Sequence, residues 1–312
     1  MIYWTHTNRR YIRVAFGLVV CLASVMVVLH YKGYDMGILN RLFGKRESHS
    51  EKEEKISSNL AFVLLTEAQL PDAEAIARAF RDFAAPMENL QSETDDTGKT
   101  ESDQSISLKL NTGEKSFVVL MPVAVPNGEA DQGAQFSLSS FRNQWELPPH
   151  RAHLVVTFNA TAESPPIVQL SRFTSLVAAV TKVSPAVGVY WGSAGATHDS
   201  EFFVSVASEQ DVISRMMLWS GVSIAREEDG RLSLLSLGME QLNLPNLLLV
   251  AGTSSESVAL ETMFDLLAYV AERGEPLSEA DTVGKTADEK LPVRYVPSPV
   301  DSSKKVWRVE LP

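Results

Sequence analysis

Apolar residues in the first half of the chain follow two patterns, one typical of strands and one typical of helices. Leu60–Leu65 is an unbroken apolar run of strand length, as expected for a central strand. After Pro71 the apolar residues recur at helical spacing as far as Phe83, and Pro86 ends that pattern. Further strands and one short helix are predicted over 106–110, 116–121, 136–145 (the helix) and 152–158. The predicted order is β-α-β-β-α-β, the ferredoxin-like arrangement.

The second half of the chain shows the same mixture. Apolar side chains mark one face of a helix over Ile167–Lys182, and a second strong helix over Ser255–Arg273 ends at Gly274. Between them we predict a helix that starts at about Ser208, with this serine as its N-cap. Short apolar segments predict strands over 187–191, 222–225, 232–237, 246–251, 293–296 and 306–311.

Strands and helices are mixed without strict alternation, so the predicted class is α+β, with mixed sheets and helices on one face. A layout that fits is two packed ferredoxin-like halves, residues 60–160 and 161–312, within one domain over 60–312. Residues 36–59 are predicted to be a charged linker, because most of this stretch lacks apolar periodicity. Residues 1–35 are a separate N-terminal segment that contains one hydrophobic helix.

The most apolar stretch is Val14–Leu29, which has basic residues on both sides. A bilayer core needs about 20 apolar helical residues, with about 17 as a lower limit, so a single-pass anchor over 12–31 is a short one. A cleaved signal peptide is a further alternative, but no small-x-small cleavage site follows. A third alternative is translation from Met36, which leaves a soluble cytoplasmic protein. The slight excess of basic residues after the run favours a cytoplasmic domain for the anchored form.

Charge and cysteine content narrow the classes of function. The chain has 28 Lys and Arg against 39 Asp and Glu, for a net charge of -11. Residues 1–35 hold 4 of the basic and 1 of the acidic residues, so 24 basic and 38 acidic residues remain and residues 36–312 carry -14. A body this acidic repels phosphate backbones, which argues against nucleic acid as a partner. Cys21 is the only cysteine, which excludes a disulfide framework and a cysteine-based metal site.

Four segments point to a known family by their order and spacing. They are Met121–Pro126 (MPVAVP), His150–Val156 (HRAHLVV), Gly188–Trp191 (GVYW) and Asp281–Leu291 (DTVGKTADEKL). Together they resemble the bacterial domain of unknown function 4261, over roughly Leu60–Leu311. The acidic stretch Ser92–Ser105 and the apolar N-terminus depart from that family's pattern. The family has no established activity, so the resemblance implies a fold and adds no catalytic residues.

Histidines are the first candidates for chemistry, because imidazoles are good ligands for zinc. His150 and His153 form an H-x-x-H pair, and His198 follows later in the chain. In an extended segment, however, residues three apart point to opposite faces, so this pair is poorly arranged for one metal ion. The aromatic residues that precede a Gly/Ser/Ala-rich loop are better placed to line a pocket. The candidate pocket combines Trp145, His153, Tyr190, Trp191 and His198.

No motif is specific enough to name a reaction, so no catalytic residue, metal ligand or cofactor is assigned. The sequence predicts a non-enzymatic bacterial interaction or binding domain with a protein partner, tethered to a membrane if the N-terminal segment is genuine. The alternative is a metal-dependent, hydrolase-like enzyme that uses His150, His153 and His198.

Overall fold

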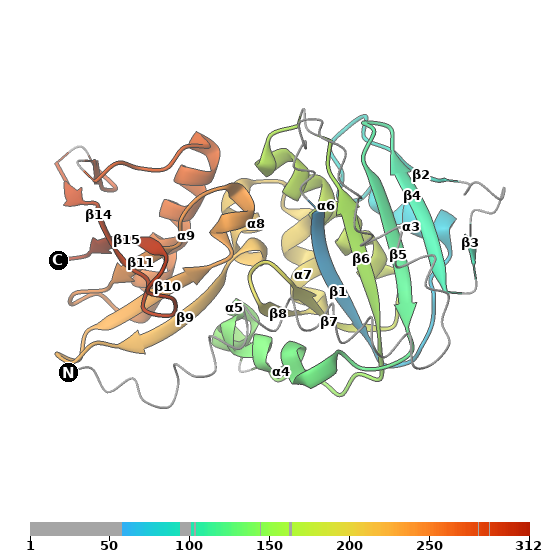
Figure 1. The fold of residues 1–312 in the computed structure, drawn as a ribbon, viewed down its shortest axis with the longest axis horizontal. Coiled ribbons are helices and arrows are strands. Elements are labelled where there is room, and N and C mark those ends of the chain that lie inside the picture. Colours follow the sequence, from blue (N-terminus) through green and yellow to red (C-terminus); the bar gives the residue numbers. More distant parts are fainter. Residues whose placement is uncertain are drawn as a thin grey trace.

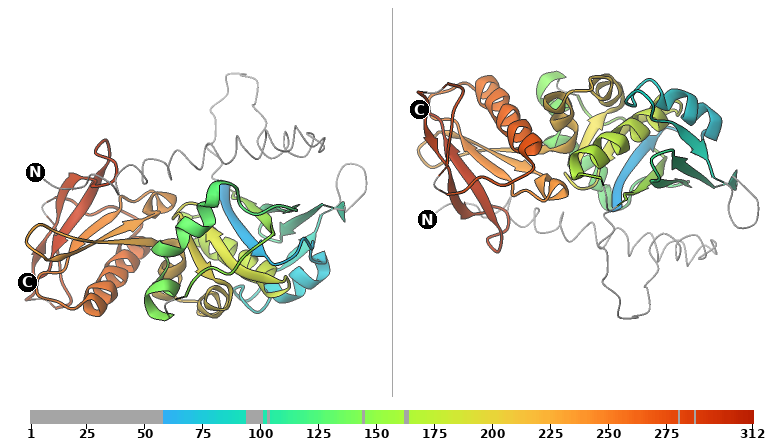
Figure 2. Two further views of the ribbon diagram at one scale, coloured as in Figure 1. Left: turned by 90° about the horizontal axis from the view of Figure 1, so that it is seen from below. Right: turned by 90° about the horizontal axis from the view of Figure 1, so that it is seen from above.

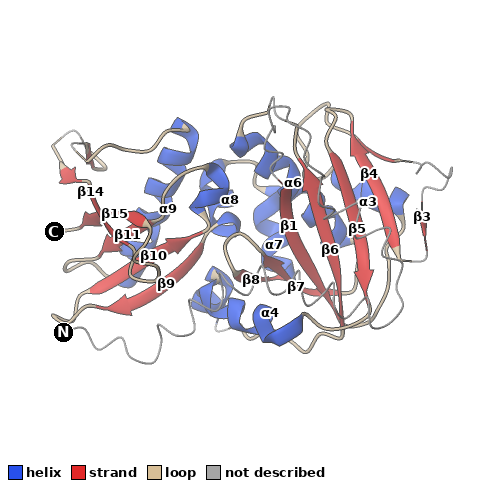
Figure 3. Ribbon diagram, in the orientation of Figure 1, coloured by secondary structure: helices blue, strands red, loops and turns tan. Residues whose placement is uncertain are grey.

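The computed structural model describes residues 58–93, 101–102, 104–143, 145–161, 164–279, 281–286 and 288–312. Two large sheets, one two-stranded sheet and the helices between and beside them make up this part of the chain (Figures 1 and 3). The predicted N-terminal anchor and nearly all of the predicted linker lie outside the described residues, so both remain predictions. Within the described ranges, no helix is both long enough and apolar enough to cross a bilayer.

The first sheet is antiparallel at every strand pair. Its strands, in spatial order, are β2 (Leu90–Ser92), β4 (Ser105–Leu110), β5 (Lys115–Met121), β6 (Ala152–Asn159), β1 (Ser58–Leu65), β7 (Ala186–Trp191) and β8 (Ala196–Asp199), with β3 (Glu101–Ser102) also paired to β4. The apolar run of β1 occupies the centre of the sheet, as its composition predicts. The sheet therefore extends to Asp199, whereas the predicted first half ends at residue 160.

The ferredoxin-like prediction is wrong for the strand order of this sheet. In a ferredoxin-like sheet the first strand lies between the third and the fourth. Here β1 lies between β6 and β7, and β5 pairs with β6. The connection from β5 to β6 explains the difference. It runs over the opposite face from α3 (Ala73–Phe80) and α6 (Pro166–Lys182) and returns the chain directly alongside β5.

Helices cover both faces of the first sheet, whereas the sequence predicts helices on one face only. On one face, which we call the α6 face, Phe173 of α6 packs against the rings of Phe158 and Trp191. Helix α4 (Glu129–Gly133) lies over the other face, which we call the α4 face (Figure 2). There Ala130 joins an apolar cluster with Phe62 and Tyr190. The helices of this half are α3 (Ala73–Phe80), η1 (Pro126–Gly128), α4 (Glu129–Gly133), η2 (Ala134–Phe136), α5 (Leu138–Asn143), α6 (Pro166–Lys182) and α7 (Ser200–Ser208).

The second sheet is mixed, because β11 and β15 are parallel and the other pairs are antiparallel. Its strands, in spatial order, are β14 (Arg294–Pro297), β15 (Lys305–Glu310), β11 (Leu247–Val250), β10 (Leu232–Leu237) and β9 (Gly221–Arg226). The remaining elements are α8 (Val212–Trp219), η3 (Met239–Leu242), α9 (Glu256–Arg273), β12 (Thr282–Val283) and β13 (Leu291–Pro292). The described chain is thus α+β, as predicted, and α7 and α8 connect the two large sheets along the chain, between β8 and β9.

Two capping aspartates correct the prediction of one helix starting at Ser208. The Asp199 side chain accepts a hydrogen bond from the Phe202 N–H at 2.8 Å and starts α7. The Asp211 side chain accepts one from the Ser214 N–H, also at 2.8 Å, and starts α8. Ser208 is therefore the last residue of α7. Two N-caps twelve positions apart divide this stretch into two short helices, because each satisfies the free N–H groups of a new first turn.

Gly238 lies where the two sheets meet, and its replacement tests how tightly they are packed. Its φ is 99°, and an added Cβ would lie 2.8 Å from Ala194 Cα and 2.9 Å from the Trp219 carbonyl oxygen. Gly238→Ala should lower the free energy of unfolding by at least about 2 kcal/mol, because alanine is strained in the left-handed conformation and its Cβ would also collide with these atoms. Urea unfolding measures the loss.

Gly230→Ala is the matched control for this substitution. Gly230 has a φ of 86°, but an added Cβ there meets nothing within 4 Å. It should therefore show only the conformational cost, about 1 kcal/mol. Equal losses for the two variants would contradict tight packing at the junction.

Candidate functional site

Strand alternation separates the residues of the predicted pocket. Tyr190 and Trp191 are neighbours on β7, so their side chains point to opposite faces of the sheet. Tyr190 lies on the α4 face, with its ring centroid 5.7 Å from that of Phe62. Trp191 lies on the α6 face, with its ring centroid 4.9 Å from that of Phe173. The pair therefore cannot line one pocket.

His153 is a fully buried imidazole on the α4 face. It stands between Leu64 and Met121 in the sheet, and its ring lies edge-on to that of Phe62 at 5.4 Å. Its Nδ1–H donates to the Val123 carbonyl oxygen at 2.8 Å, because a carbonyl can only accept. Its Nε2 has no hydrogen-bond partner among the described residues. Burial lowers the pKa of His153 to about 4, so the ring is neutral at pH 7.

His150 is half-buried and also contacts the segment that follows β5. Its Nε2 accepts a hydrogen bond from the Val125 N–H at 3.3 Å. Burial lowers the pKa of His150, and the negative charge of Asp131 opposes that shift. His150 and His153 together hold the backbone of residues 123–125, which leads into η1 and α4. Their ring nitrogens therefore stabilise the cover of the α4 face.

His198 lies on the α6 face, on the edge strand β8. Its Nε2–H donates to the Leu218 carbonyl oxygen at 3.1 Å, so its Nδ1 accepts the Ser137 O–H at 2.8 Å. A serine hydroxyl that donates to a neutral imidazole is the arrangement of an activated nucleophile. Both side chains are fully buried, however, so Ser137 is closed to a substrate. Burial lowers the pKa of His198 to about 4.

The structure divides four of the five predicted pocket residues into two pairs on opposite faces of the sheet, one pair around Phe62 and the other around Phe203. His153 and Tyr190 both contact Phe62 on the α4 face, while Trp191 and His198 lie on the α6 face. Trp145 is half-buried in the segment between α5 and β6. The three histidines do not converge, and within the described chain no three His, Cys, Asp or Glu side chains are grouped as a metal ion would require.

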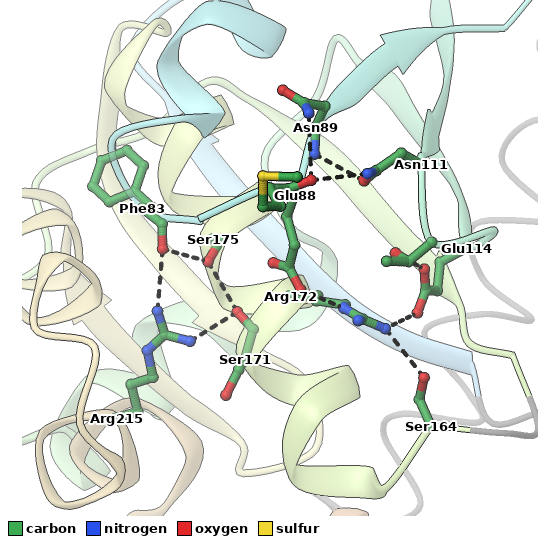
Figure 4. A network of polar contacts seen from close by, with 12 residues as sticks. Phe83, Glu88, Asn89, Asn111, Glu114, Ser164, Ser171, Arg172, Ser175 and Arg215 are labelled. Carbon is green, nitrogen blue, oxygen red and sulfur yellow. Dashed lines mark hydrogen bonds and ion pairs between the residues drawn. The ribbon is translucent and has the colours of Figure 1, made fainter. Parts of the chain in front are cut away.

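A buried charge network on α6 is absent from the sequence predictions (Figure 4). Arg172 Nε donates to Glu88 at 2.8 Å, and Arg172 Nη1 donates to Glu114 and, at 3.1 Å, to Ser164 Oγ. Glu114 is fully buried. Burial lowers the pKa of Arg172, but the two carboxylates outweigh it and raise the pKa overall. The network ties α6 to the α3–β2 connection and to the β4–β5 hairpin.

Arg215 is a second buried cation beside this network, and its hydrogen bonds go to backbone carbonyls. Its guanidinium donates to the carbonyl oxygens of Ser171 at 3.0 Å and Phe83 at 3.3 Å (Figure 4). Burial lowers its pKa, and the charges of Glu88 and Asp211 oppose that shift. Arg215 thereby joins α8 to α6 and to the end of α3. No local sequence signal marks either arginine, because their partners lie far away in the chain.

The solvent face of α9 is the most distinctive described surface. Val258 is 45% exposed and Tyr269 is 51% exposed, and carboxylates stand between and beside them at helical spacing. Lys285 reaches two of these carboxylates, Glu261 at 3.4 Å and Asp265 at 3.5 Å. We call this surface the α9 stripe; it consists of Val258, Glu261, Asp265, Tyr269 and Glu272.

The comparisons with known proteins found one family model that matches part of the chain. A family model described as "Domain of unknown function (DUF4261)" matches residues 235–310. The match confirms the resemblance over the segment from β10 to β15, which includes α9 and the motif Asp281–Leu291. The other three motifs lie outside the matched residues. No curated protein and no solved structure matches the chain.

Proposed function

We propose that this chain is a non-enzymatic binding domain whose α9 stripe binds a basic, partly apolar segment of a protein partner. The observation that carries the proposal is the α9 stripe itself. Val258 and Tyr269 are two of the four most exposed large apolar side chains in the described chain, and a third, Ile213, lies on the adjacent helix α8. The two apolar side chains stand about three helical turns apart on one helix face, a spacing that a partner segment can span with two anchor residues.

The charges of the stripe define the chemistry of the partner. Glu261, Asp265 and Glu272 lie on the same helix face as the two apolar residues, and Lys285 offsets part of this charge. A partner segment with lysine or arginine between apolar residues matches this pattern in both charge and apolar spacing. The aromatic ring of Tyr269 adds a large contact area at low entropic cost, which is typical of residues that dominate binding energy.

The histidines support a binding role over the alternative hydrolase. A metal-dependent enzyme needs about three ligands around one position. Here His150 and His153 bond to the backbone of residues 123–125, and His198 lies on the other face of the sheet. All three imidazoles contribute to the packing of the first sheet, so their geometry favours a structural role.

Photo-crosslinking in bacterial cells tests the proposal. A photoreactive phenylalanine analogue at position 269 should give one dominant adduct with a single protein. Glu261→Lys and Glu272→Lys, introduced together in that background, should reduce the adduct at least about fivefold, because they reverse the charge of the stripe. Washing isolated complexes with about 0.5 M salt before illumination should have a similar effect, since salt screens exposed charges.

Position 87 provides the matched control. Met87 is 87% exposed but lies on the connection from α3 to β2, away from the second sheet. The analogue at position 87 should not give the adduct seen at 269. The same adducts from both positions, or none from 269, would contradict binding at the α9 stripe.

A further inference from the structure

The segment Asp281–Leu291, one of the four segments that resemble the family, contains a small hairpin that reaches α9 through Lys285. Its two strands, β12 and β13, pair antiparallel, with Val283 opposite Leu291. Val283 is buried and belongs to the main core. The hairpin is therefore anchored to the domain by packing as well as by strand pairing.

The chain between these two strands is closed tightly, and this closure fixes the position of Lys285. The Lys285 N–H donates to Glu289 Oε2 at 2.6 Å, and the Glu289 N–H donates to the Thr286 carbonyl oxygen at 3.3 Å. Gly284 permits this close approach, because an added Cβ would lie 2.2 Å from the Glu289 carbonyl oxygen. The backbone of Lys285 is thus held in place, while its side chain extends to α9.

The Lys285 ammonium lies beside two carboxylates of the α9 stripe. Its Nζ is 3.4 Å from Glu261 and 3.5 Å from Asp265, and these two acids are one helical turn apart. All three side chains are at least 43% exposed. Exposed ion pairs of this kind are weak, so water or another cation can replace the ammonium. Lys285 therefore occupies, reversibly, the position that a basic residue of a partner would take.

The other end of the stripe carries no such internal cation. Glu272 is exposed, and no ion pair joins it to a described residue. Tyr269 lies three positions before it and on the same face of the helix. A partner can thus contact the end formed by Tyr269 and Glu272 without displacing an ion pair. The end formed by Glu261 and Asp265 becomes available only when Lys285 leaves it.

We infer that Lys285 is an internal competitor of the partner and lowers the apparent affinity of the α9 stripe until a basic side chain of the partner displaces it. The inference rests on the proposed function and adds regulation to it. A site that is open in only a fraction of molecules binds with an affinity reduced by that fraction. Because exposed ion pairs are weak, we expect the reduction to be about threefold.

The photo-crosslink from position 269 measures this competition. In the background that carries the photoreactive analogue, Lys285→Ala should raise the yield of the adduct about threefold after short illumination. Lys285→Arg keeps the charge and should leave the yield unchanged. Lys290→Ala is the matched control, because Lys290 is exposed in the same segment and no ion pair joins it to a described residue. It removes the same charge and should also leave the yield unchanged.

The possible results separate this inference from the proposed function. An adduct that depends on Glu261 and Glu272, but has the same yield in the Lys285→Ala and Lys290→Ala variants, would overturn the competition and leave the binding site in place. The absence of any adduct from position 269 in every variant would overturn both. Urea unfolding should give nearly equal stabilities for the two alanine variants, and Lys285→Gln provides the same test if Lys285→Ala does not fold.

Discussion

Lowering the pH from 7 to 4 should reduce the free energy of unfolding by about 6 kcal/mol through two imidazoles alone. His153 and His198 both have a pKa lowered from 6.5 to about 4 by burial. Each contributes about 3 kcal/mol, since one unit of pKa difference corresponds to about 1.4 kcal/mol. This change is comparable to the whole stability of many domains, about 5–15 kcal/mol.

The direction follows from where protons bind. Above pH 6.5 both states hold these rings neutral, and their contribution to stability is fully present. Between pH 6.5 and 4 the unfolded chain takes up protons that the folded chain cannot, so stability falls. Protonating His153 would bury an N–H with no acceptor at Nε2, and protonating His198 would make Nδ1 a donor, so it could no longer accept the Ser137 O–H. Below pH 4 these two groups add no further dependence.

Urea titrations at pH 7, 6, 5 and 4 measure this dependence, and single variants assign it. His153→Gln and His198→Gln should each remove about half of the pH-dependent loss, although each also changes stability at pH 7. Carbon-13-labelled histidine observed by NMR should show two rings that stay neutral in the folded protein at pH 5. Two rings that titrate near pH 6.5 in the folded state would contradict the prediction.

Local patterns predict the helices whose ends are set by nearby residues. α6 begins at Pro166, where proline fits the first turn, and α9 ends at Gly274 in the left-handed conformation that favours glycine. The predicted bounds of both helices agree with the structure to within one residue at each end. Ser208 shows the limit of such patterns, because a serine with an acidic residue three positions later resembles a cap although the true cap is Asp211.

Sheet order and long-range partners are not encoded locally, which limits what the sequence shows of the site. β8 is recognisable as a strand only through its pairing with β7, since Ala196–Asp199 lacks apolar character. The bond between Ser137 and His198 joins residues 61 positions apart. By contrast, alternation along β7 is enough to separate Tyr190 from Trp191 once the strand is accepted. Aromatic composition alone does not show which face a side chain occupies, so it groups Tyr190 with Trp191 although the strand separates them.

Removing the carboxylate of Glu114 should destabilise the protein by about 3 kcal/mol. Glu114 is fully buried and bonds to both Arg172 and Thr112. Glu114→Ala leaves a largely buried guanidinium with only one of its two carboxylates, Glu88, and broken buried ion pairs typically cost about 3–5 kcal/mol. We expect the lower end of that range because Glu88 remains. Urea unfolding at pH 7 measures the loss.

Asp82→Ala is the matched control. Asp82 forms an ion pair at 2.9 Å with Lys182, which lies on α6, as Arg172 does. Both members of that pair are about half exposed, so its removal should cost less than about 1 kcal/mol. A double-mutant cycle of Glu114→Ala with Arg172→Met should show a coupling of about 1.5 kcal/mol or more, because each single change leaves a buried charge that the double change partly removes. Additive effects, or equal losses for Glu114→Ala and Asp82→Ala, would show that the network in Figure 4 contributes little to holding α6 against the hairpin.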